Sequence, residues 1–448
     1  MRTRVLLNLE GKHRFVGLLS ADRMGALFQY APEFVADGLE VSPLSCPLRA
    51  SVFRGIPGFV SDSLPDGWGN LLLSRRHACE DRRFAEMAVS ARLAGIGNQG
   101  VGALEFEPET SNPEESCRHD SCNCIDLDAV ADGIRSVQAD EATHTELDEL
   151  IRLSGYAGGA HPKIVCLVSD DKRLVKPGNA PRPNGAPWII KFSNLTDPED
   201  SGALEYAVSL LAKSAGIDMP ETHLFESSKG AGWFGIRRFD RTSSGKVHMA
   251  TAAGLLHCDF RQPCLDYQTL MALTQHLSGA GDLEQMLKRA YFNFVIDNRD
   301  DHAKNFSFLM DGKGRWRLSP AYDLIPNIGG FEHMTALSGV GKSPARTLFV
   351  RLGEDFGMTL RKAQAALEEV DDSLDQWLQL ARTAVSKHLL YLNRSDKTQP
   401  DTSSSVRPSY ERTLFIKAQA YARSAFLDRR RSPSCRVLQW PSDRVRCR

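Results

Sequence analysis

The sequence predicts an α+β protein built from more than one folded unit. Its 448 residues exceed the length of one ordinary domain. Short, strand-like apolar segments alternate with helical ones up to about residue 240, whereas helical periodicity predominates from about 250 to 390. We therefore expect units that contain strands first, and a mostly helical unit after them.

The composition is that of an ordinary globular protein, with 42% hydrophobic and 25% charged residues. The 55 Lys+Arg and 56 Asp+Glu leave a net charge of -1, so no overall field draws the chain to nucleic acid or to an anionic membrane. The apolar run from Val5 to Leu7 is too short for a signal peptide, and no uncharged run approaches the roughly 18 residues of a membrane helix. The ten cysteines are scattered, which favours reduced thiols. We expect a cytoplasmic protein without membrane contact.

The first part of the chain predicts a small unit of strands and helices. "RVLLNLEGKHRFVGLL" (4–19) indicates two strands joined in a hairpin at "EGK", and 67–95 has helical character. "VGALEFEPE" (101–109) indicates a further strand. Residues 107–124 are polar and acidic, as expected of a solvated linker.

The middle of the chain predicts helices around a second set of strands. A helical region covers about 125–154, and "GGAHPKIVCLVS" (158–169) and "PWIIKFS" (187–193) are strand-like. "SGALEYAVSLLAKSAGI" (201–217) has the apolar spacing of an amphipathic helix, and "AGWFGIRRFDR" (231–241) is a strand leading into a turn. The predicted units are a subdomain at 1–106, a linker at 107–124, a strand-rich lobe at 125–240, a helical lobe at 241–395, and a basic, partly disordered tail at 396–448.

Three motifs resemble ligand-binding patterns but are better explained otherwise. "GIGNQG" (95–100) follows a helix and precedes a strand, the reverse of a dinucleotide site, so we expect a turn. "ALSGVGKS" (336–343) lacks the first glycine of a phosphate-binding loop, and we expect a turn there too. A metal site is the less favoured alternative to a solvated loop for Cys117, His119, Cys122 and Cys124, because their spacing is not one of the usual paired patterns.

The most informative stretch is "NRDDHAKN" (298–305), between two apolar, aromatic-rich runs. Protein kinases carry H-R-D-x-x-x-x-N, in which the Asp accepts the proton of the substrate hydroxyl and the Asn binds magnesium. Asp300 and Asn305 have that spacing. Taken alone, a polar loop that joins two core segments explains the stretch almost as well. We expect Asp301 to be solvated or to lie at a helix end.

Three further features occur in the order that a kinase fold requires. A glycine-rich segment, "SGYAGGAHPK" (154–163), lies where a loop that covers phosphates belongs. Lys191 ends an apolar strand, and Glu205 follows on a predicted helix as a candidate ion-pair partner. Asp323 lies within the apolar "LSPAYDLIPN", where an acid is costly unless it is paired or binds metal. The shared order is stronger support than any one match.

With these residues, the chain over roughly 1–390 resembles the HipA family of bacterial serine/threonine kinases, the toxins of HipA/HipB toxin–antitoxin pairs. The resemblance implies a protein-kinase-like, two-lobed α+β fold with an extra N-terminal α/β subdomain and a mostly helical C-lobe. It rests on "SDSLPDGWG" (61–69), "VGALEF" (101–106), "GGAHPK" (158–163), "IIKFS" (189–193), "RRFDR" (237–241), "NRDDHAKNFSF" (298–308) and "SPAYDLIP" (319–326).

The resemblance also implies cofactors and roles. It implies ATP and Mg²⁺, with Asp300 as catalytic base, Asn305 and Asp323 as metal ligands, and Lys191 as the phosphate contact. We also expect Lys304 to add charge near the transferred phosphoryl group. For His302 we favour hydrogen bonding inside the loop over a part in the transfer itself. The residues expected around the nucleotide are Gly158, Gly159, Ala160, Lys163, Lys191, Glu205, Arg238, Phe239 and His302.

The implied partners are a protein substrate, such as an aminoacyl-tRNA synthetase, and a helix-turn-helix antitoxin through which DNA would be met only indirectly. Two alternatives stay open: a small-molecule phosphotransferase, and a non-catalytic kinase fold acting as a corepressor with an antitoxin. The sequence departs from the family at Tyr156, where members often carry an autophosphorylated serine, and at Arg237, which replaces a glutamate.

Overall fold

The computed structural model describes residues 2–22, 25–79, 84, 87–109, 124–155, 158–198, 200–327, 329–377 and 379–380. Contacts divide the chain into two units, Met1–Ser403 and Ser404–Arg448, and the described residues all belong to the first. The predicted tail, most of the predicted linker, Tyr156, and three of the four candidate metal ligands (Cys117, His119 and Cys122) lie outside the described residues. Cys124, the fourth, is exposed.

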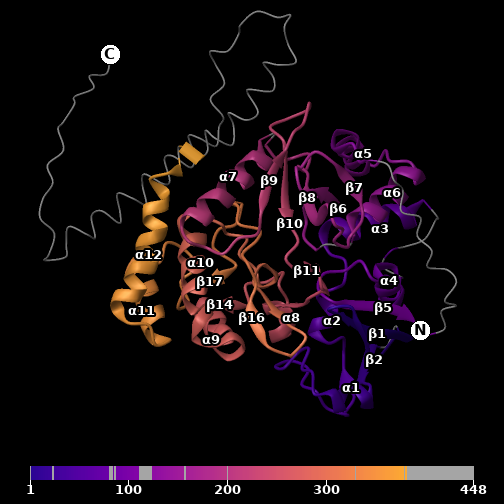
Figure 1. The fold of residues 1–448 in the computed structure, drawn as a ribbon, viewed down its shortest axis with the longest axis horizontal. Helices are drawn as coiled ribbons and strands as arrows, with labels where there is room; N and C mark the ends of the chain where they lie inside the picture. Colours follow the sequence, from indigo (N-terminus) through magenta and orange to yellow (C-terminus); the bar gives the residue numbers. More distant parts are fainter. Residues whose placement is uncertain are drawn as a thin grey trace, which may run out of the picture. The chain divides into compact units, whose positions relative to one another are not determined.

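The N-terminal part is an antiparallel sheet with the strand order β4-β3-β2-β1-β5 (Figure 1). The predicted hairpin is confirmed, since β1 pairs with β2 and the turn uses Glu10 and Gly11, both with positive φ. The strands are β1 (Arg2–Leu9), β2 (Lys12–Asp22), β3 (Gly25–Tyr30), β4 (Phe53–Arg54) and β5 (Leu104–Pro108).

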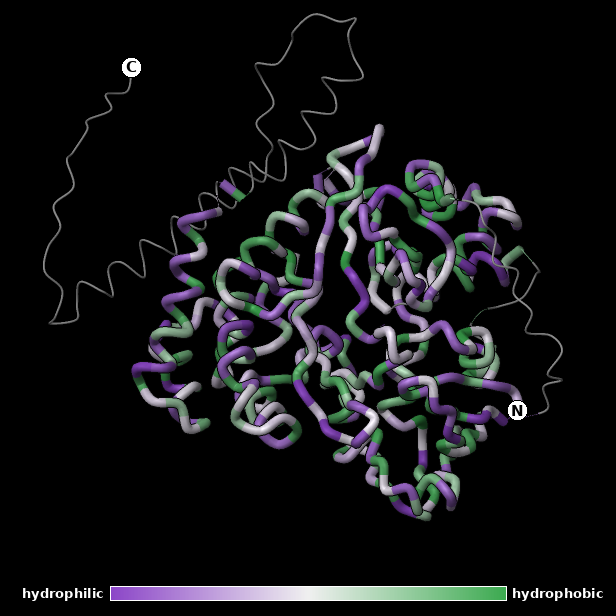
Figure 2. The backbone as a smooth tube through the Cα atoms, in the orientation of Figure 1, coloured by the Kyte–Doolittle hydropathy of each residue, from purple (hydrophilic) through white to green (hydrophobic). Residues whose placement is uncertain are grey.

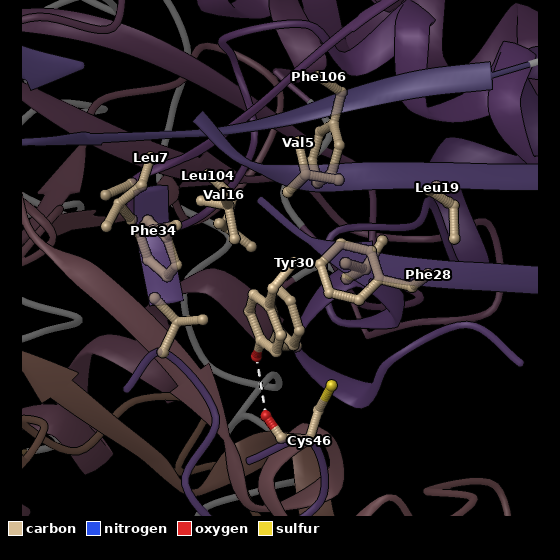
Figure 3. Close-up of a cluster of buried hydrophobic side chains, with 14 of the residues drawn as sticks. Val5, Leu7, Val16, Leu19, Phe28, Tyr30, Phe34, Cys46, Leu104 and Phe106 are labelled. Carbon is tan, nitrogen blue, oxygen red and sulfur yellow. Dashed lines mark hydrogen bonds between the residues drawn. The ribbon is translucent and has the colours of Figure 1, made fainter. Parts of the chain in front are cut away.

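One face of this sheet carries an aromatic core (Figure 3). The ring of Phe28 meets that of Tyr30 edge-to-face with centroids 4.9 Å apart, and the Tyr30 hydroxyl donates a 2.8 Å hydrogen bond to the Cys46 carbonyl. Burying each such ring contributes about 1.5–3 kcal/mol. The helices of this part are α1 (Pro32–Asp37), α2 (Gly58–Ser61), α3 (Gly67–Ala78) and α4 (Val89–Ile96).

A second antiparallel sheet, in the order β7-β6-β8-β10-β9, forms the middle of the molecule. The predicted helical region at 125–154 is two helices, because Asp140 takes a left-handed conformation and Thr143 starts a new helix with a capping box to Glu146. The elements are α5 (Leu127–Ala139), α6 (His144–Ser154), β6 (Lys163–Ser169), β7 (Val175–Pro177), β8 (Gly185–Lys191), α7 (Ser201–Ser214), β9 (Thr222–Phe225) and β10 (Trp233–Arg237).

The last described part is mostly helical, as predicted, but it also contains a three-stranded sheet that the sequence did not indicate. That sheet has the order β13-β15-β16. Two further short strands of this part, β14 and β17, pair in parallel with each other. α12 alternates hydrophobic and hydrophilic residues, with one face against α10 (Figure 2). Bounds are β13 (His248–Thr251), α8 (Ala252–Leu256), β14 (Leu265–Asp266), α9 (Tyr267–Ser278), α10 (Leu283–Val295), β15 (Ser307–Met310), β16 (Trp316–Leu318), β17 (Thr335–Ala336), α11 (Arg346–Asp355) and α12 (Leu360–Leu374).

Shorter elements complete the description. β11 (Arg241–Thr242) and β12 (Gly245–Lys246) form a hairpin after β10. The 3-10 turn η3 (Gly279–Asp282) directly precedes α10, and the 3-10 turn η4 (Ala303–Asn305) closes the loop at 298–305. The two glycine-rich segments, 95–100 and 336–343, form turns as expected. No helix among the described residues combines the length and the apolar character needed to span a membrane.

Candidate active site

A cavity lies between the second sheet and the helical part, and its lining combines apolar and charged side chains. Most of the apolar ones come from β8, β10 and β13, together with the ring of Tyr322. The apolar residues are Val101, Ile189, Phe234, Ile236, Phe239, Met249 and Tyr322, and the polar ones include Asp62, Asp66, Lys163, Lys191, Glu205, His302, Lys304, Asn305 and Asp323.

Lys191 joins two carboxylates in the lining of this cavity. Its Nζ lies 2.6 Å from Glu205 Oε1 and 2.5 Å from Asp323 Oδ1. β8 ends at Lys191, α7 carries Glu205, and Asp323 takes a φ of 57°, which turns the chain sharply there. The structure thus brings together the lysine, the helical acid and the late aspartate that the sequence singled out, from three separate elements.

Electrostatics keep the Lys191–Asp323 pair ionised. Burial alone would raise the pKa of Asp323, but the ammonium groups of Lys191 and Lys163 outweigh it and hold that pKa well below its ordinary value. For Lys191, burial would lower the pKa, and the two carboxylates outweigh it and raise the pKa. Burial raises the pKa of Glu205, with Lys191 acting in the opposite sense.

The loop at 298–305, which is the candidate catalytic loop, follows the end of α10. Asp297 has a φ of 60° and reverses the chain, and the buried Asn298 amide donates a 3.0 Å hydrogen bond to Asn293 Oδ1 on α10. Asn305 Nδ2 donates a 2.8 Å hydrogen bond to the Asp300 carbonyl, which closes the Asp-x4-Asn loop on itself. The Asp300 side chain is exposed and does not line the cavity, although partial burial still raises its pKa.

Asp301 was predicted to be solvated or to lie at a helix end, and the prediction was wrong. The residue is 0% exposed, and its carboxylate accepts a 2.8 Å hydrogen bond from the Tyr267 hydroxyl and a 3.1 Å one from the Thr335 backbone. His333 Nδ1 lies 3.1 Å from the same carboxylate. Asp301 therefore fixes the loop from inside. Charge density in the sequence does not reveal which acid of a run turns inward.

The glycine-rich loop contributes Gly158 and Gly159 to the lining of the cavity. Gly159 has a φ of 104°, and a side chain there would collide with Lys163 Nζ, which donates to the Gly158 carbonyl. Lys163 and Lys191 are partners in the β6–β8 register, and burial together with Lys191 lowers the pKa of Lys163 to about 8. Ala160 does not line the cavity but packs against Gly67.

Asp66, at the start of α3, is a site residue that our reasoning from sequence missed. Its Oδ1 accepts a 2.5 Å hydrogen bond from the Gly159 backbone and its Oδ2 lies 2.9 Å from Lys304 Nζ. The carboxylate does not cap its own helix. It connects the N-terminal part to both the glycine-rich loop and the catalytic loop. The motif "SDSLPDGWG" contains Asp66, but we used that motif only as support for the family resemblance and assigned no role to the residue.

His302 and Lys304 both lie beside Phe260. Lys304 Nζ is 4.4 Å from the centroid of that ring, and the His302 and Phe260 rings meet edge-to-face at 5.3 Å. Buried His302 Nδ1 has no hydrogen-bond partner among the described residues. The internal hydrogen bonding that we favoured for His302 is therefore not seen at that atom.

Arg238 and Phe239 both line the cavity, but they are held in different ways. The Arg238 guanidinium is 1% exposed and binds Asp240 through Nε (2.9 Å) and a terminal nitrogen (2.7 Å), so it holds the turn after β10. Phe239 faces Tyr322, with ring centroids 5.8 Å apart. The predicted nucleotide contact of Arg238 stays a prediction, and its charged group is already engaged within the protein.

The residues predicted to bind magnesium have suitable chemistry. Mg²⁺ prefers hard oxygen donors and is commonly held by one or two protein groups together with water and substrate phosphates. Asp323 supplies carboxylate oxygens, and the Asn305 amide is oriented by its bond to the Asp300 carbonyl. Within the described ranges no cluster of three or more His, Cys, Asp or Glu could hold a metal by itself. A two-ligand site is therefore the form that fits.

Comparisons with known proteins identify the family of the chain. Residues 7–107 match the family described as HipA N-terminal domain, and residues 155–378 match the HipA-like C-terminal domain. Two proteins of Sinorhizobium fredii (strain NBRC 101917 / NGR234) are similar. "Putative kinase Y4dM" is 29% identical over 163 residues, which are 33% of this chain and only 39% of that protein. "Putative kinase Y4mE" is 28% identical over 343 residues, 72% of this chain and 77% of that protein.

A solved structure shows the same fold. It is a chain from the complex of HipA, HipB and operator DNA of a Shewanella oneidensis MR-1 toxin–antitoxin system. The TM-score is 0.64 at 17% identity, and the match covers 95% of this chain and 98% of that one. The predicted kinase-like α+β fold is thereby confirmed. With both domains matched, the chain belongs to the HipA family.

Proposed function

We propose that the protein is an ATP- and Mg²⁺-dependent serine/threonine protein kinase. The observation that carries the proposal is the Lys191 ammonium, held between Glu205 and Asp323 in a cavity that also has apolar lining residues. Apolar side chains suit a nucleotide base, and two neighbouring lysines, Lys163 and Lys191, suit its phosphates.

In this mechanism the protein positions groups and places charge. Asp300, at the edge of the site, accepts the proton of the acceptor hydroxyl, and its raised pKa favours that role. Lys304, held by Asp66, lies beside the reacting groups and stabilises negative charge. A magnesium ion bound by Asn305 and Asp323 would neutralise phosphate charge. Positioning and charge stabilisation account for most of the catalysis of phosphoryl transfer, so few further side-chain functions are required.

A second cavity supports a protein as the acceptor. It lies between the N-terminal part and the α8 region and shares Asp62, Asp66 and Lys304 with the first. A groove that adjoins the nucleotide cavity at these residues can admit a chain segment carrying Ser or Thr. We name it the acceptor groove. Its lining also includes Asn70, Arg92, His257, Cys258, Asp259, Phe260 and Arg261.

We further propose that the kinase acts as a growth-arresting toxin on a translation factor, such as an aminoacyl-tRNA synthetase, and is restrained by a helix-turn-helix antitoxin. The solved complex that contains HipB and operator DNA supports the antitoxin partner. DNA would then be met through that partner, in keeping with a net charge of -1.

The test is incubation of the purified protein with γ-labelled ATP, Mg²⁺ and a bacterial lysate. Label on Ser or Thr of a lysate protein is the expected result. Label on a metabolite would show a small-molecule phosphotransferase instead. ATP binding without any transfer would favour a non-catalytic corepressor, and the absence of both binding and transfer would overturn the proposal.

A further inference from the structure

Two cysteines next to the acceptor groove lie in direct contact. The Sγ atoms of Cys258 and Cys264 are 2.9 Å apart. Cys264 is exposed and Cys258 is partly exposed, so small solutes can reach the pair. Two thiols this close can be joined without a large backbone movement.

Hydrogen bonds and flanking regular structure hold the two ends of the segment 258–264 close together. Cys258 follows α8, and its backbone N–H donates a 3.0 Å hydrogen bond to the Ala253 carbonyl. Between the cysteines, Asp259 accepts hydrogen bonds from Arg261 N through its side chain (3.1 Å) and from Gln262 N through its carbonyl (3.2 Å). Cys264 leads directly into β14, which pairs with β17. Regular structure thus anchors both cysteines.

The same segment places Phe260 against the catalytic loop. Its ring lies over Lys304 Nζ, 4.4 Å from the centroid, and packs edge-to-face with His302. Residues 257–261 line the acceptor groove, but none of them lines the cavity that we assign to the nucleotide. A covalent change in the segment would therefore act first on the acceptor side, and on the nucleotide cavity only through His302 and Lys304, which line it.

We propose that Cys258 and Cys264 are a reversible redox-modification site, at which a hydroperoxide forms a disulfide that fixes Phe260 over Lys304 and narrows the acceptor groove. The consequence for phosphoryl transfer rests on the proposed kinase function, whereas the formation of the disulfide does not. Disulfides of this kind, formed and reduced again, are typical of redox sensing in reducing compartments.

The chemistry involves two electrons. The thiolate of Cys264 attacks one peroxide oxygen of H₂O₂ and breaks the O–O bond, giving a sulfenic acid on Cys264 and releasing water once a proton is taken up. The Cys258 sulfur then attacks the Cys264 sulfur, and the hydroxyl leaves with the Cys258 proton as a second water. Two thiols are oxidised and one peroxide is reduced. A small dithiol reverses the change by thiol–disulfide exchange.

The two cysteines differ in a way that sets this order. Cys264 is the more exposed. Burial, together with the adjacent Cys264, raises the pKa of Cys258 above its ordinary value, which disfavours its thiolate. The first attack therefore belongs to Cys264 and the second to Cys258.

The first experiment treats the reduced full-length protein with H₂O₂, alkylates free thiols and identifies the products by mass spectrometry. We expect peroxide to form a disulfide between Cys258 and Cys264. At the same peroxide concentrations, the exposed Cys79 and Cys124 should form no disulfide, whether they stay free for alkylation or become oxidised. The matched variants are Cys264→Ser, which cannot form the bond, and Cys79→Ser, which retains it. Continued alkylation of both Cys258 and Cys264 while Cys79 is oxidised would overturn the proposal.

The second experiment measures ATP binding and protein phosphorylation in the same samples. Oxidation is expected to reduce phosphorylation of the protein acceptor several-fold with unchanged ATP affinity, and a dithiol should restore it. Cys264→Ser should keep its activity in peroxide, and Cys79→Ser should respond as the natural chain does. Equal transfer by the reduced and the disulfide-bonded protein would refute the effect on the groove. Absence of transfer in both states, with the disulfide present, would instead count against the kinase function.

Discussion

Asp66 and Lys304 form a buried ion pair, 2.9 Å from Oδ2 to Nζ, across 238 residues of sequence. Because Asp66 also accepts the Gly159 N–H, one carboxylate holds the glycine-rich loop and the catalytic loop at a fixed spacing. Burial would raise the pKa of Asp66, but Lys304 and these hydrogen bonds outweigh it and lower that pKa. The N-terminal part therefore takes part in the site through this residue.

Asp66→Ala is expected to lower both stability and phosphoryl transfer. Breaking a buried ion pair leaves Lys304 uncompensated and costs about 3–5 kcal/mol. Urea unfolding and steady-state kinetics measure the two effects. Asp148→Ala is the matched control, because Asp148 pairs with Arg76 at the surface, where its side chain is 59% exposed. Equal losses in both variants would contradict the role given to Asp66.

Lys191→Met is expected to abolish ATP binding and to destabilise the fold, because Glu205 and Asp323 would face each other without the ammonium. We expect a loss of about 3 kcal/mol or more in the free energy of unfolding. Isothermal titration with ATP and chemical denaturation test this. Lys229→Met, at the more exposed pair with Asp132, should change neither property appreciably. ATP binding that survives in Lys191→Met would remove the main support for the nucleotide site.

ATP binding should weaken as the pH rises through about 8. Burial and the neighbouring Lys191 lower the pKa of Lys163 to about 8, while Asp323, Asp66 and Glu205 act in the opposite direction. Below this pH both lysines carry charge toward the phosphates, and above it only Lys191 does. The KM for ATP should therefore increase between pH 7 and 9. Lys163→Arg should flatten the profile, since arginine keeps its proton, and a natural chain with a flat profile would contradict this assignment.

Asp301→Ala is expected to destabilise the protein more than any change at an exposed acid. The substitution leaves Tyr267, His333 and the Thr335 N–H without their acceptor, and each buried group left unsatisfied costs about 1–3 kcal/mol. Thermal unfolding measures the loss. Asp372→Ala on α12 is the control, because Asp372 is exposed. Similar melting temperatures for the two variants would show that the buried network is dispensable.

The sequence predicts the part of the site that depends on spacing. Four residues could be identified because each lies at a recognisable place in a strand, helix or loop motif, namely Lys191, Glu205, Asn305 and Asp323. The order of these residues along the chain indicated the fold that brings them together. Asp66 could not be found in this way, because its partners are remote in sequence and nothing local to "LPDGW" marks a contact with Lys304.

The short strands of the helical part could not be predicted from the hydrophobic pattern of the sequence either. β13 has four residues and is buried at most of them, so it shows no alternation that distinguishes a strand from the start of a helix. Its pairing with β15, some sixty residues later, decides its structure. The Cys258–Cys264 contact is a similar case, since a six-residue spacing alone does not place two thiols together.

The most direct test of the account is the single-turnover rate of phosphoryl transfer from γ-labelled ATP by the variant Asp300→Asn. The matched control is Asp297→Asn. Asp297 pairs with Arg299 and has no assigned part in the chemistry. Because Asp300 does not line the nucleotide cavity, Asp300→Asn should bind ATP normally yet transfer phosphate about 10²–10⁴-fold more slowly. Asp297→Asn should transfer at close to the natural rate. Undiminished transfer by Asp300→Asn would contradict the account.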